Sequence, residues 1–180
     1  MYSHPKAKNY VSGLSFHPYS GDHFDILSNF HKKYPKAILL SSEITVTSGR
    51  WPAGFNMKSG AWQLGQAYGL DILGNLNSGS HGYVDWNLIL NSKGGPNHAG
   101  NMCASATVVE GGNLYMHPQY YFIGHFSKYL VPGSKRIKSQ VLNSKAQKVK
   151  PDRPFQECGD VDGLKATAFK RPDGKKAVVV

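Results

Sequence analysis

The amino-acid sequence predicts an α/β fold built on parallel strands, followed by a smaller antiparallel β domain. Three short β-rich runs, YVSGLSFHPY, AILLSSEITV and GYVDWNLILN, end in polar or aromatic residues and precede turn and helix signals. After Gly133 the pattern changes to the runs RIKSQVL, LKATAFK and KKAVVV, which are separated by polar turns. One of these turns, RPDGKK, contains the Asp-Gly pair that favours a β-hairpin. The first pattern is typical of a parallel barrel and the second of a β-sheet domain.

Three stretches have the apolar spacing of helices. The stretch 22–34 lies between the first two β-rich runs and begins with Asp22, which suits the first turn of a helix. The stretch 59–73 lies between the second and third runs, and glycines weaken its middle. A third helix, 118–130, is predicted to stop before Pro132 and Gly133.

The composition indicates a packed globular chain that is part of a longer protein. Hydrophobic residues make up 40% and aromatic residues 12% of the sequence, and 20 glycines with 10 prolines predict many turns. The length of 180 residues is short of the roughly 250 that a complete (β/α)₈ barrel requires. The amino terminus lacks the apolar stretch of a signal peptide, and no segment reaches the ~18 apolar residues of a membrane span. We therefore expect that Met1 is not the authentic start and that any export signal lies upstream.

The formal net charge is +10, and the cations are concentrated toward the carboxyl terminus. The stretch 132–150 contains basic but no acidic side chains: Lys135, Arg136, Lys138, Lys145, Lys148 and Lys150. Such a stretch favours an anionic lipid surface, an acidic partner or a nucleic acid. A solvated lysine-rich loop explains the same composition equally well.

Neither a disulfide framework nor a metal site is predicted. The chain has two cysteines, Cys103 and Cys158, far apart in sequence and without CxxC spacing, so we expect two free thiols. The 8 histidines include no HExxH motif, and the glycine groups NSGSHG and GGPN lack the spacing that cradles phosphates. We therefore expect no metal and no cofactor.

In a parallel barrel the reactive groups come from the carboxyl ends of the strands. Polar or aromatic residues follow all three β-rich runs: His17 and Tyr19, then Glu43, then Asp85, Trp86 and Asn87. Glu43 comes directly after ILLSS, where a carboxylate costs free energy unless it is paired or used. The residues alone support two interpretations of Glu43 equally: a nucleophile or general base, and a structural glutamate bonded to its neighbours.

Five segments, SSE, GAW, GYVDWNLILN, GGPN and GHFSKYLVPGSKRI, occur in the order and approximate spacing found in glucosylceramidases. Over almost its whole length the chain thus resembles glycoside hydrolase family 30. The combination of VDWNL, GGPN and GHFSK is specific, although each motif alone is weak. The resemblance implies that residues 1–132 are the carboxy-terminal portion of a TIM-barrel domain, from about strand 6 to helix 8. Residues 133–180 would begin a β-sandwich domain.

The resemblance also implies roles for particular residues. Glu43 matches the family's catalytic nucleophile, and Trp86 and Asn101 match its active-site tryptophan and asparagine. His17 and Tyr19 match a His-Trp-Tyr motif whose tryptophan is replaced here by Pro18.

Each of these roles has a physical basis and a structural alternative. A retaining glycosidase needs an ionised carboxylate about 5 Å from a protonated one, and Tyr19 can donate a hydrogen bond that favours the charged form of Glu43. Trp86 offers a flat apolar face and an N–H donor to a sugar, and Asn101 can both donate and accept. The alternatives are aromatic packing at the barrel rim for Tyr19, core packing for Trp86 and satisfaction of backbone groups for Asn101.

The family's acid/base residue lies in an Asn-Glu-Pro motif, which the 180 residues do not contain. The remaining glutamates, Glu110 and Glu157, do not follow barrel-like strands, so we expect this chain alone to have negligible hydrolase activity.

The function implied is a retaining β-glucosidase that hydrolyses glucosylceramide to glucose and ceramide, in a lysosomal or secreted parent protein. The expected partners are the glycolipid substrate and an anionic membrane surface or an activator protein, and no nucleic acid is expected. The alternatives are an endo-acting β-glycanase of the same family, such as a β-1,6-glucanase, and a non-catalytic fragment that binds polyanions or membranes through residues 132–150.

Overall fold

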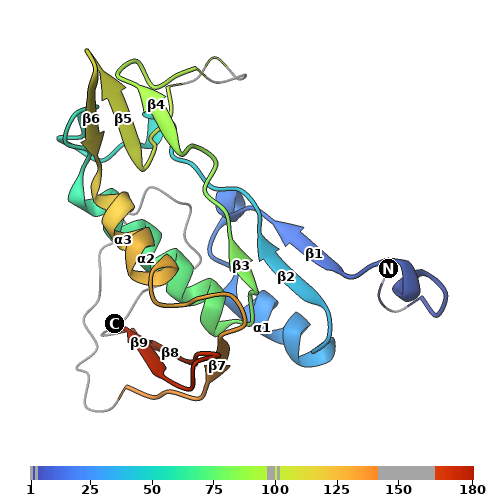
Figure 1. Ribbon diagram of the computed structural model, residues 1–180. Coiled ribbons are helices and arrows are strands. Elements are labelled where there is room, and N and C mark those ends of the chain that lie inside the picture. The colour runs from blue at the N-terminus through green and yellow to red at the C-terminus, as the bar shows by residue number, and fades with distance from the viewer. Residues whose placement is uncertain (1, 3, 97–99, 101, 142–164) are drawn as a thin grey trace.

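The computed structural model describes residues 2, 4–96, 100, 102–141 and 165–180 (Figure 1). Its α-helices in this part of the chain are α1 (Phe24–Lys33), α2 (Trp62–Asn77) and α3 (Pro118–Ser127). All three lie within or close to the stretches predicted to be helical, although α2 extends four residues further than expected. None of the described helices is both long and apolar enough to cross a membrane.

The first sheet is parallel, as predicted. It consists of β1 (Gly13–Phe16), β2 (Ile38–Ser41) and β3 (Gly82–Tyr83), in that order. Helix α1 connects β1 to β2 and α2 connects β2 to β3, because parallel neighbours need a long crossover connection. All three carboxyl ends therefore lie at one edge of the sheet, as in the carboxy-terminal part of a barrel.

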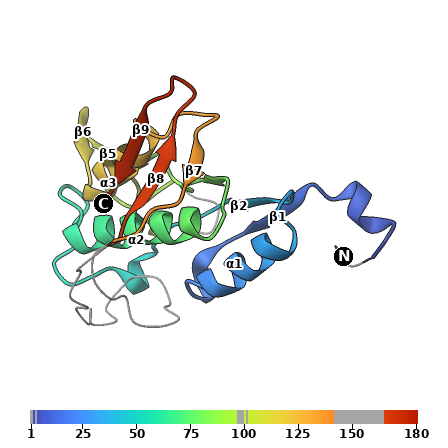
Figure 2. The ribbon, with the colours of Figure 1, turned by 90° about the horizontal axis from the view of Figure 1, so that it is seen from below.

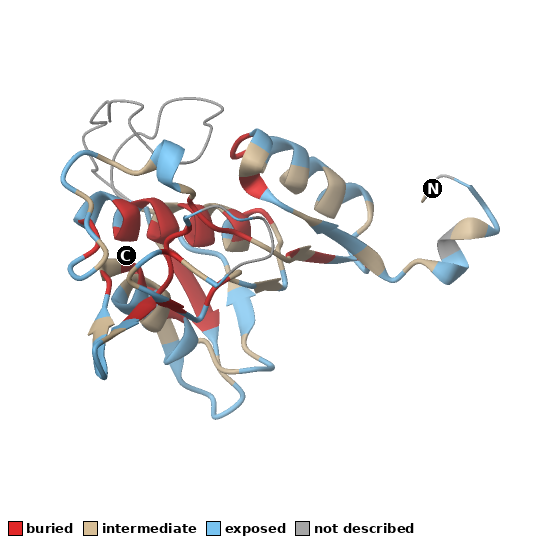
Figure 3. Cartoon of the chain, turned by 90° about the horizontal axis from the view of Figure 1, so that it is seen from above, coloured by how far each residue is buried: buried red, intermediate tan, exposed pale blue. Residues whose placement is uncertain are grey.

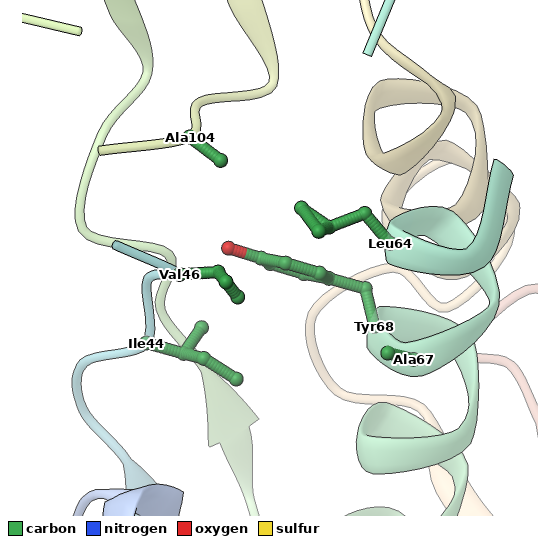
Figure 4. Packing of buried hydrophobic residues seen from close by; sticks show 6 residues of the cluster. All are labelled: Ile44, Val46, Leu64, Ala67, Tyr68 and Ala104. Atoms are coloured by element: carbon green, nitrogen blue, oxygen red, sulfur yellow. The ribbon is translucent and has the colours of Figure 1, made fainter. Parts of the chain in front are cut away.

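The main core lies between α2 and the segment that follows β2. Tyr68, Leu64 and Ala67 of α2 pack with Ile44 and Val46, and Ala104 completes the cluster. Figure 4 shows the Tyr68 ring reaching from α2 toward Ile44 and Val46, and Figure 3 shows that buried residues gather around this helix. Leu64 and Ile44 are both 0% exposed, and burial of such a side chain contributes roughly 1.5–3 kcal/mol.

The glycines of α2 are packing positions as well as weak helix formers. A Cβ at Gly65 would lie 2.6 Å from the Phe122 ring, and one at Gly69 would lie 2.7 Å from it. Both distances are shorter than any ordinary van der Waals contact, so glycine lets α3 approach α2 closely. Figure 1 shows the two helices side by side.

The second sheet begins within the third β-rich run. Gly82–Tyr83 of GYVDWNLILN form β3, just before the predicted strand end at Asp85, and Ile89–Asn91 of the same run form β4. Strand β4 pairs in parallel with β5 (Thr107–Glu110), which forms an antiparallel hairpin with β6 (Asn113–Met116). Between β3 and β4, Asn87 is buried and its side-chain amide donates to the Thr45 hydroxyl at 3.1 Å.

The third sheet is antiparallel and consists of β7 (Lys135–Ile137), β8 (Thr167–Lys170) and β9 (Lys176–Val179). The predicted Asp-Gly turn joins β8 to β9, with Gly174 at a φ of 82° that favours glycine. Val179 packs against Ile72, Leu73 and Phe126, and thus attaches this sheet to α2 and α3. Figure 2 shows its three strands next to the helices.

Candidate active site

Glu43 lies two residues beyond the end of β2, at the carboxyl edge of the parallel sheet. On either side of it, the Ser42 amide donates to the Phe16 carbonyl at 3.1 Å and Ile44 is fully buried. These two anchors hold the backbone at Glu43, while its side chain remains 32% exposed. The carboxylate therefore projects from a rigid strand end into accessible space.

Two side chains from the end of β1 reach this carboxylate. The Tyr19 hydroxyl donates a hydrogen bond to Glu43 Oε1 at 3.0 Å, and His17 Nδ1 lies 3.6 Å from the same oxygen. Tyr19 belongs to the short 3₁₀-helix Pro18–Ser20, and His17 is its N-cap residue. The buried Pro18 occupies the first helical position, where its fixed φ is favourable. The structure thus brings together His17, Tyr19 and Glu43.

The Tyr19 hydroxyl is a stable donor. Burial, and next the hydrogen bond to Glu43, raise the pKa of Tyr19 well above its ordinary value. The hydroxyl therefore remains protonated at any physiological pH and keeps its proton for the hydrogen bond to Glu43 Oε1.

Trp86 lies beside the Glu43 segment. The Val84 amide donates to the Ser41 carbonyl at 2.8 Å, and the Trp86 amide donates to the Ile44 carbonyl at 2.9 Å. The backbone that carries Trp86 therefore runs alongside the backbone that carries Glu43. Trp86 is partly exposed, so it is not a fully buried core residue.

Asp85, one of the polar residues that follow the third β-rich run, is also part of the candidate site. The hydroxyl of the fully buried Tyr68 donates to Asp85 Oδ1 at 3.0 Å. Burial raises the pKa of Asp85 to about 7, although hydrogen bonds from Tyr68 and from the Trp86 backbone oppose the shift. An acidic residue inside the apolar run GYVDW is the one sequence signal for this group, since its partner lies 17 residues earlier on another element.

The other predicted residues lie apart from this group or outside the described residues. Asn101, Glu157 and Cys158 belong to the part of the chain that the structure does not describe, so the role of Asn101 stays a prediction. Glu110 lies on β5 and forms an ion pair with Lys58 at 2.8 Å, and this pair lowers its pKa. Cys103 is buried and carries a reduced thiol.

Parallel strands joined by helices, with polar and aromatic side chains at their carboxyl ends, define the class of parallel-barrel proteins. Residues 1–130 match the glycosyl hydrolase family 30 TIM-barrel domain, and residues 133–180 match the glycosyl hydrolase family 30 beta sandwich domain. The chain therefore belongs to glycosyl hydrolase family 30.

Similar proteins carry glucosylceramidase names. The chain is 32% identical to "Lysosomal acid glucosylceramidase" of Mus musculus, over 99% of this chain and 32% of that protein. It is 31% identical to "Putative glucosylceramidase 4" of Caenorhabditis elegans, over 98% of this chain and 31% of that protein. The chain thus spans about a third of the length of these curated relatives.

Solved structures support the same fold. SrfJ from Salmonella typhimurium superimposes with a TM-score of 0.69 at 30% identity, over 93% of this chain and 33% of that one. The endo-beta1,6-glucanase BT3312 also gives a TM-score of 0.69, at 23% identity, over 97% of this chain and 35% of that one. This chain therefore has the architecture of the carboxy-terminal part of a TIM barrel followed by the start of an antiparallel β-sandwich domain.

Proposed function

We propose that the protein containing this chain is a retaining β-glucosidase that hydrolyses glucosylceramide to glucose and ceramide, with Glu43 as its nucleophile. The observation that carries the proposal is the hydrogen bond from the Tyr19 hydroxyl to Glu43 Oε1, 3.0 Å long, at the carboxyl edge of the parallel sheet. The glucosylceramidase names of the relatives support the choice of substrate.

The proposed reaction has two steps. The Glu43 carboxylate attacks the anomeric carbon, so that a bond forms between C1 and a carboxylate oxygen while the bond from C1 to the ceramide oxygen breaks. The departing oxygen takes a proton from a carboxylic acid outside these 180 residues. That group then removes a proton from water, which attacks C1, releases glucose and regenerates Glu43.

The neighbours of Glu43 have distinct parts in this proposal. Tyr19 keeps its hydrogen bond to the ionised nucleophile before attack and after release of glucose. His17, 3.6 Å from the same oxygen, adds favourable charge whenever it is protonated. Trp86 provides an apolar face and a donor for the sugar ring. Asn101, by its match to the family, would contact a sugar hydroxyl.

The proposal extends to the rest of the protein. Residues 1–132 would complete a barrel with a preceding segment that supplies the acid/base residue, and residues 133–180 would form part of a β-sandwich domain. The 180 residues alone would then have negligible activity, because loss of acid assistance costs roughly 10² to 10⁴ in rate. We propose a lysosomal or secreted parent that acts with an anionic membrane surface or an activator protein. The name of the mouse relative supports the lysosomal location.

Covalent labelling tests the proposal. The full-length protein is treated with a mechanism-based cyclitol that alkylates the nucleophile of a β-glucosidase, and the modified peptide is identified by mass spectrometry. We expect the label on Glu43, and we expect Glu43→Gln to abolish labelling and to lower kcat by roughly 10⁴-fold or more. Glu110→Gln is the matched control, because Glu110 lies on β5 of the second sheet, where it forms an ion pair with Lys58. This variant should label normally. Label on any residue other than Glu43 would refute the assignment.

An endo-acting β-glycanase is the second candidate, and Pro18 favours it. The proline replaces the tryptophan of the family's motif between His17 and Tyr19, and its side chain is buried, so it offers no exposed ring to an aglycone. Comparison of kcat/KM for glucosylceramide and for β-1,6-linked gluco-oligosaccharides separates the two activities. Faster turnover of the oligosaccharides would replace the lipid substrate with a polysaccharide.

A further inference from the structure

The Thr45 hydroxyl joins two segments that are distant from it in the sequence. It donates to the Ala104 carbonyl at 3.2 Å, and it accepts a hydrogen bond from the Asn87 side-chain amide at 3.1 Å. Ala104 lies 59 positions after Thr45, and Asn87 lies 42 positions after it. Thr45 is only 5% exposed, and both partners are buried as well. One hydroxyl therefore binds polar groups from two other parts of the chain inside the protein.

Two of the three joined segments carry residues of the candidate active site. Glu43 lies two residues before Thr45, and Trp86 directly precedes Asn87. The hydrogen bond between Thr45 and Asn87 therefore connects the segment of the proposed nucleophile to the segment of the proposed sugar-binding tryptophan.

The segment that carries Trp86 lies between β3 and β4, outside both strands. The Trp86 amide donates to the Ile44 carbonyl at 2.9 Å, and at the next residue the Asn87 side chain donates to Thr45. These are consecutive attachments between the same two segments, the first through the backbone and the second through side chains. Two attachments at neighbouring residues fix the direction of a chain, whereas a single one leaves it free to rotate about the bond.

The hydroxyl of Thr45 contributes geometry that an apolar side chain could not supply. Its neighbours Ile44 and Val46 are almost fully buried, and Figure 4 shows both facing the Tyr68 ring. A valine at position 45 would have nearly the same size and would bury no polar group. A hydrogen bond, however, requires a particular distance and direction, because it weakens steeply when it is bent.

We propose that Thr45 is a positioning residue for glycoside hydrolysis, whose hydroxyl acts through Asn87 to fix Trp86 relative to Glu43. The inference rests on the proposed function, in which Glu43 attacks the anomeric carbon of a sugar ring that lies against Trp86. This spacing matters for the rate, because a displacement of about 1 Å in a catalytic site can reduce the rate roughly 10²-fold.

Replacement of Thr45 with and without its hydroxyl tests the proposal. Thr45→Val removes the hydroxyl, and in the full-length protein kcat/KM on a soluble aryl β-glucoside should fall by roughly 10- to 10²-fold. Thr45→Ser keeps the hydroxyl and should stay within about threefold of wild type. Equal losses in the two variants would overturn the proposal, as would a wild-type kcat/KM in Thr45→Val.

Ser80→Ala is the matched control that separates positioning from stability. The Ser80 hydroxyl also bridges the first sheet, since it donates to the Leu39 carbonyl at 3.3 Å and to the Gly82 carbonyl at 2.9 Å. It does so at the amino end of β3, away from the candidate active site. Both Ser80→Ala and Thr45→Val should lower the Tm, but only Thr45→Val should lower kcat/KM. An equal loss of kcat/KM in the control would show a general effect of stability and would overturn the proposal.

A double variant tests whether Thr45 acts through Trp86. Trp86→Ala removes the aromatic face, so in this background Thr45→Val should cause less than about threefold further loss of kcat/KM. Multiplication of the two single losses would show independent action and would overturn the proposal. Asn87→Leu removes the donor at the other end of the contact and should reproduce the loss seen in Thr45→Val. A wild-type kcat/KM in Asn87→Leu would be equally incompatible with the proposal.

Hydrogen exchange reports on Trp86 without any substrate. The Trp86 amide, followed by mass spectrometry in peptides that contain it, should exchange roughly tenfold faster in Thr45→Val than in wild type. Its exchange should be unaltered in Ser80→Ala, and unaltered exchange in Thr45→Val would overturn the proposal. If the wild-type protein cleaves no β-glucoside, the proposed function fails, while the exchange rate still decides whether Thr45 fixes Trp86.

Discussion

Replacement of Asp85 by asparagine should remove a pH dependence from the stability of the protein. Burial raises the pKa of the Asp85 carboxyl from its ordinary 3.8 to about 7, so the folded state binds this proton more tightly than the unfolded chain does. Stability contributed by the group is fully present below about pH 4 and is lost as the pH rises through about 7. The difference between the two pKa values corresponds to about 4 kcal/mol.

Asp85→Asn preserves the size of the side chain and an oxygen that can accept the Tyr68 hydrogen bond, 3.0 Å long in the structure, but it cannot ionise. Near pH 4 the variant and the wild type should be equally stable. Near pH 7.5 the variant should be more stable by about 4 kcal/mol, since the wild type then carries a buried charge.

The assay is urea unfolding followed by tryptophan fluorescence at a series of pH values between about 4 and 8. Asp173→Asn is the matched control, because Asp173 lies in the exposed turn between β8 and β9, and it should leave the pH dependence of the wild type unaltered. If Asp85→Asn shows the same fall in stability with pH as the wild type, the raised pKa of Asp85 is not the cause, and the argument from burial fails.

Two further predictions concern the nucleophile and the packing of the helices. Tyr19→Phe removes the 3.0 Å hydrogen bond to Glu43. Because a hydrogen bond to a charged group contributes about 1.5–3 kcal/mol, kcat/KM of the full-length enzyme on a soluble β-glucoside should fall by roughly 10- to 10²-fold. An unchanged kcat/KM would show that the bond does not assist the reaction. Gly65→Ala should destabilise the fold by about 1–3 kcal/mol in urea unfolding, because its Cβ would lie 2.6 Å from the Phe122 ring. Gly124→Ala on α3 has open space around its Cβ and should stabilise by about 0.5–1 kcal/mol; equal effects of the two substitutions would contradict the packing argument.

Most secondary-structure elements could be predicted because they depend on local patterns. Two β-rich runs predicted β1, which ends at Phe16, and β2, which ends at Ser41. The Asp-Gly turn predicted the hairpin of β8 and β9. The run GYVDWNLILN contributes to two strands, β3 and β4. Between them the Asn87 side chain donates to Thr45, 42 positions earlier in the sequence, and no local pattern indicates such a partner.

The candidate site could be predicted only in outline. The ends of the β-rich runs predicted the positions of Tyr19, Glu43 and Trp86, together with His17, and the family resemblance added their roles and Asn101. The contact between Tyr68 and Asp85 could not be predicted, because a helix and a strand end must first pack before a tyrosine hydroxyl and a carboxylate can meet.

By itself the sequence determined that the first part of this chain alternates strands with helices, that its ionisable and aromatic residues follow the strands, and that a β-hairpin closes the last sheet. Those properties follow from hydrophobic periodicity and turn chemistry, which act over a few residues. Only the tertiary structure decided which side chain holds Glu43 and how far burial raises the pKa of Asp85. Each of these depends on distances between separate elements, and such distances exist only after the helices and sheets have packed.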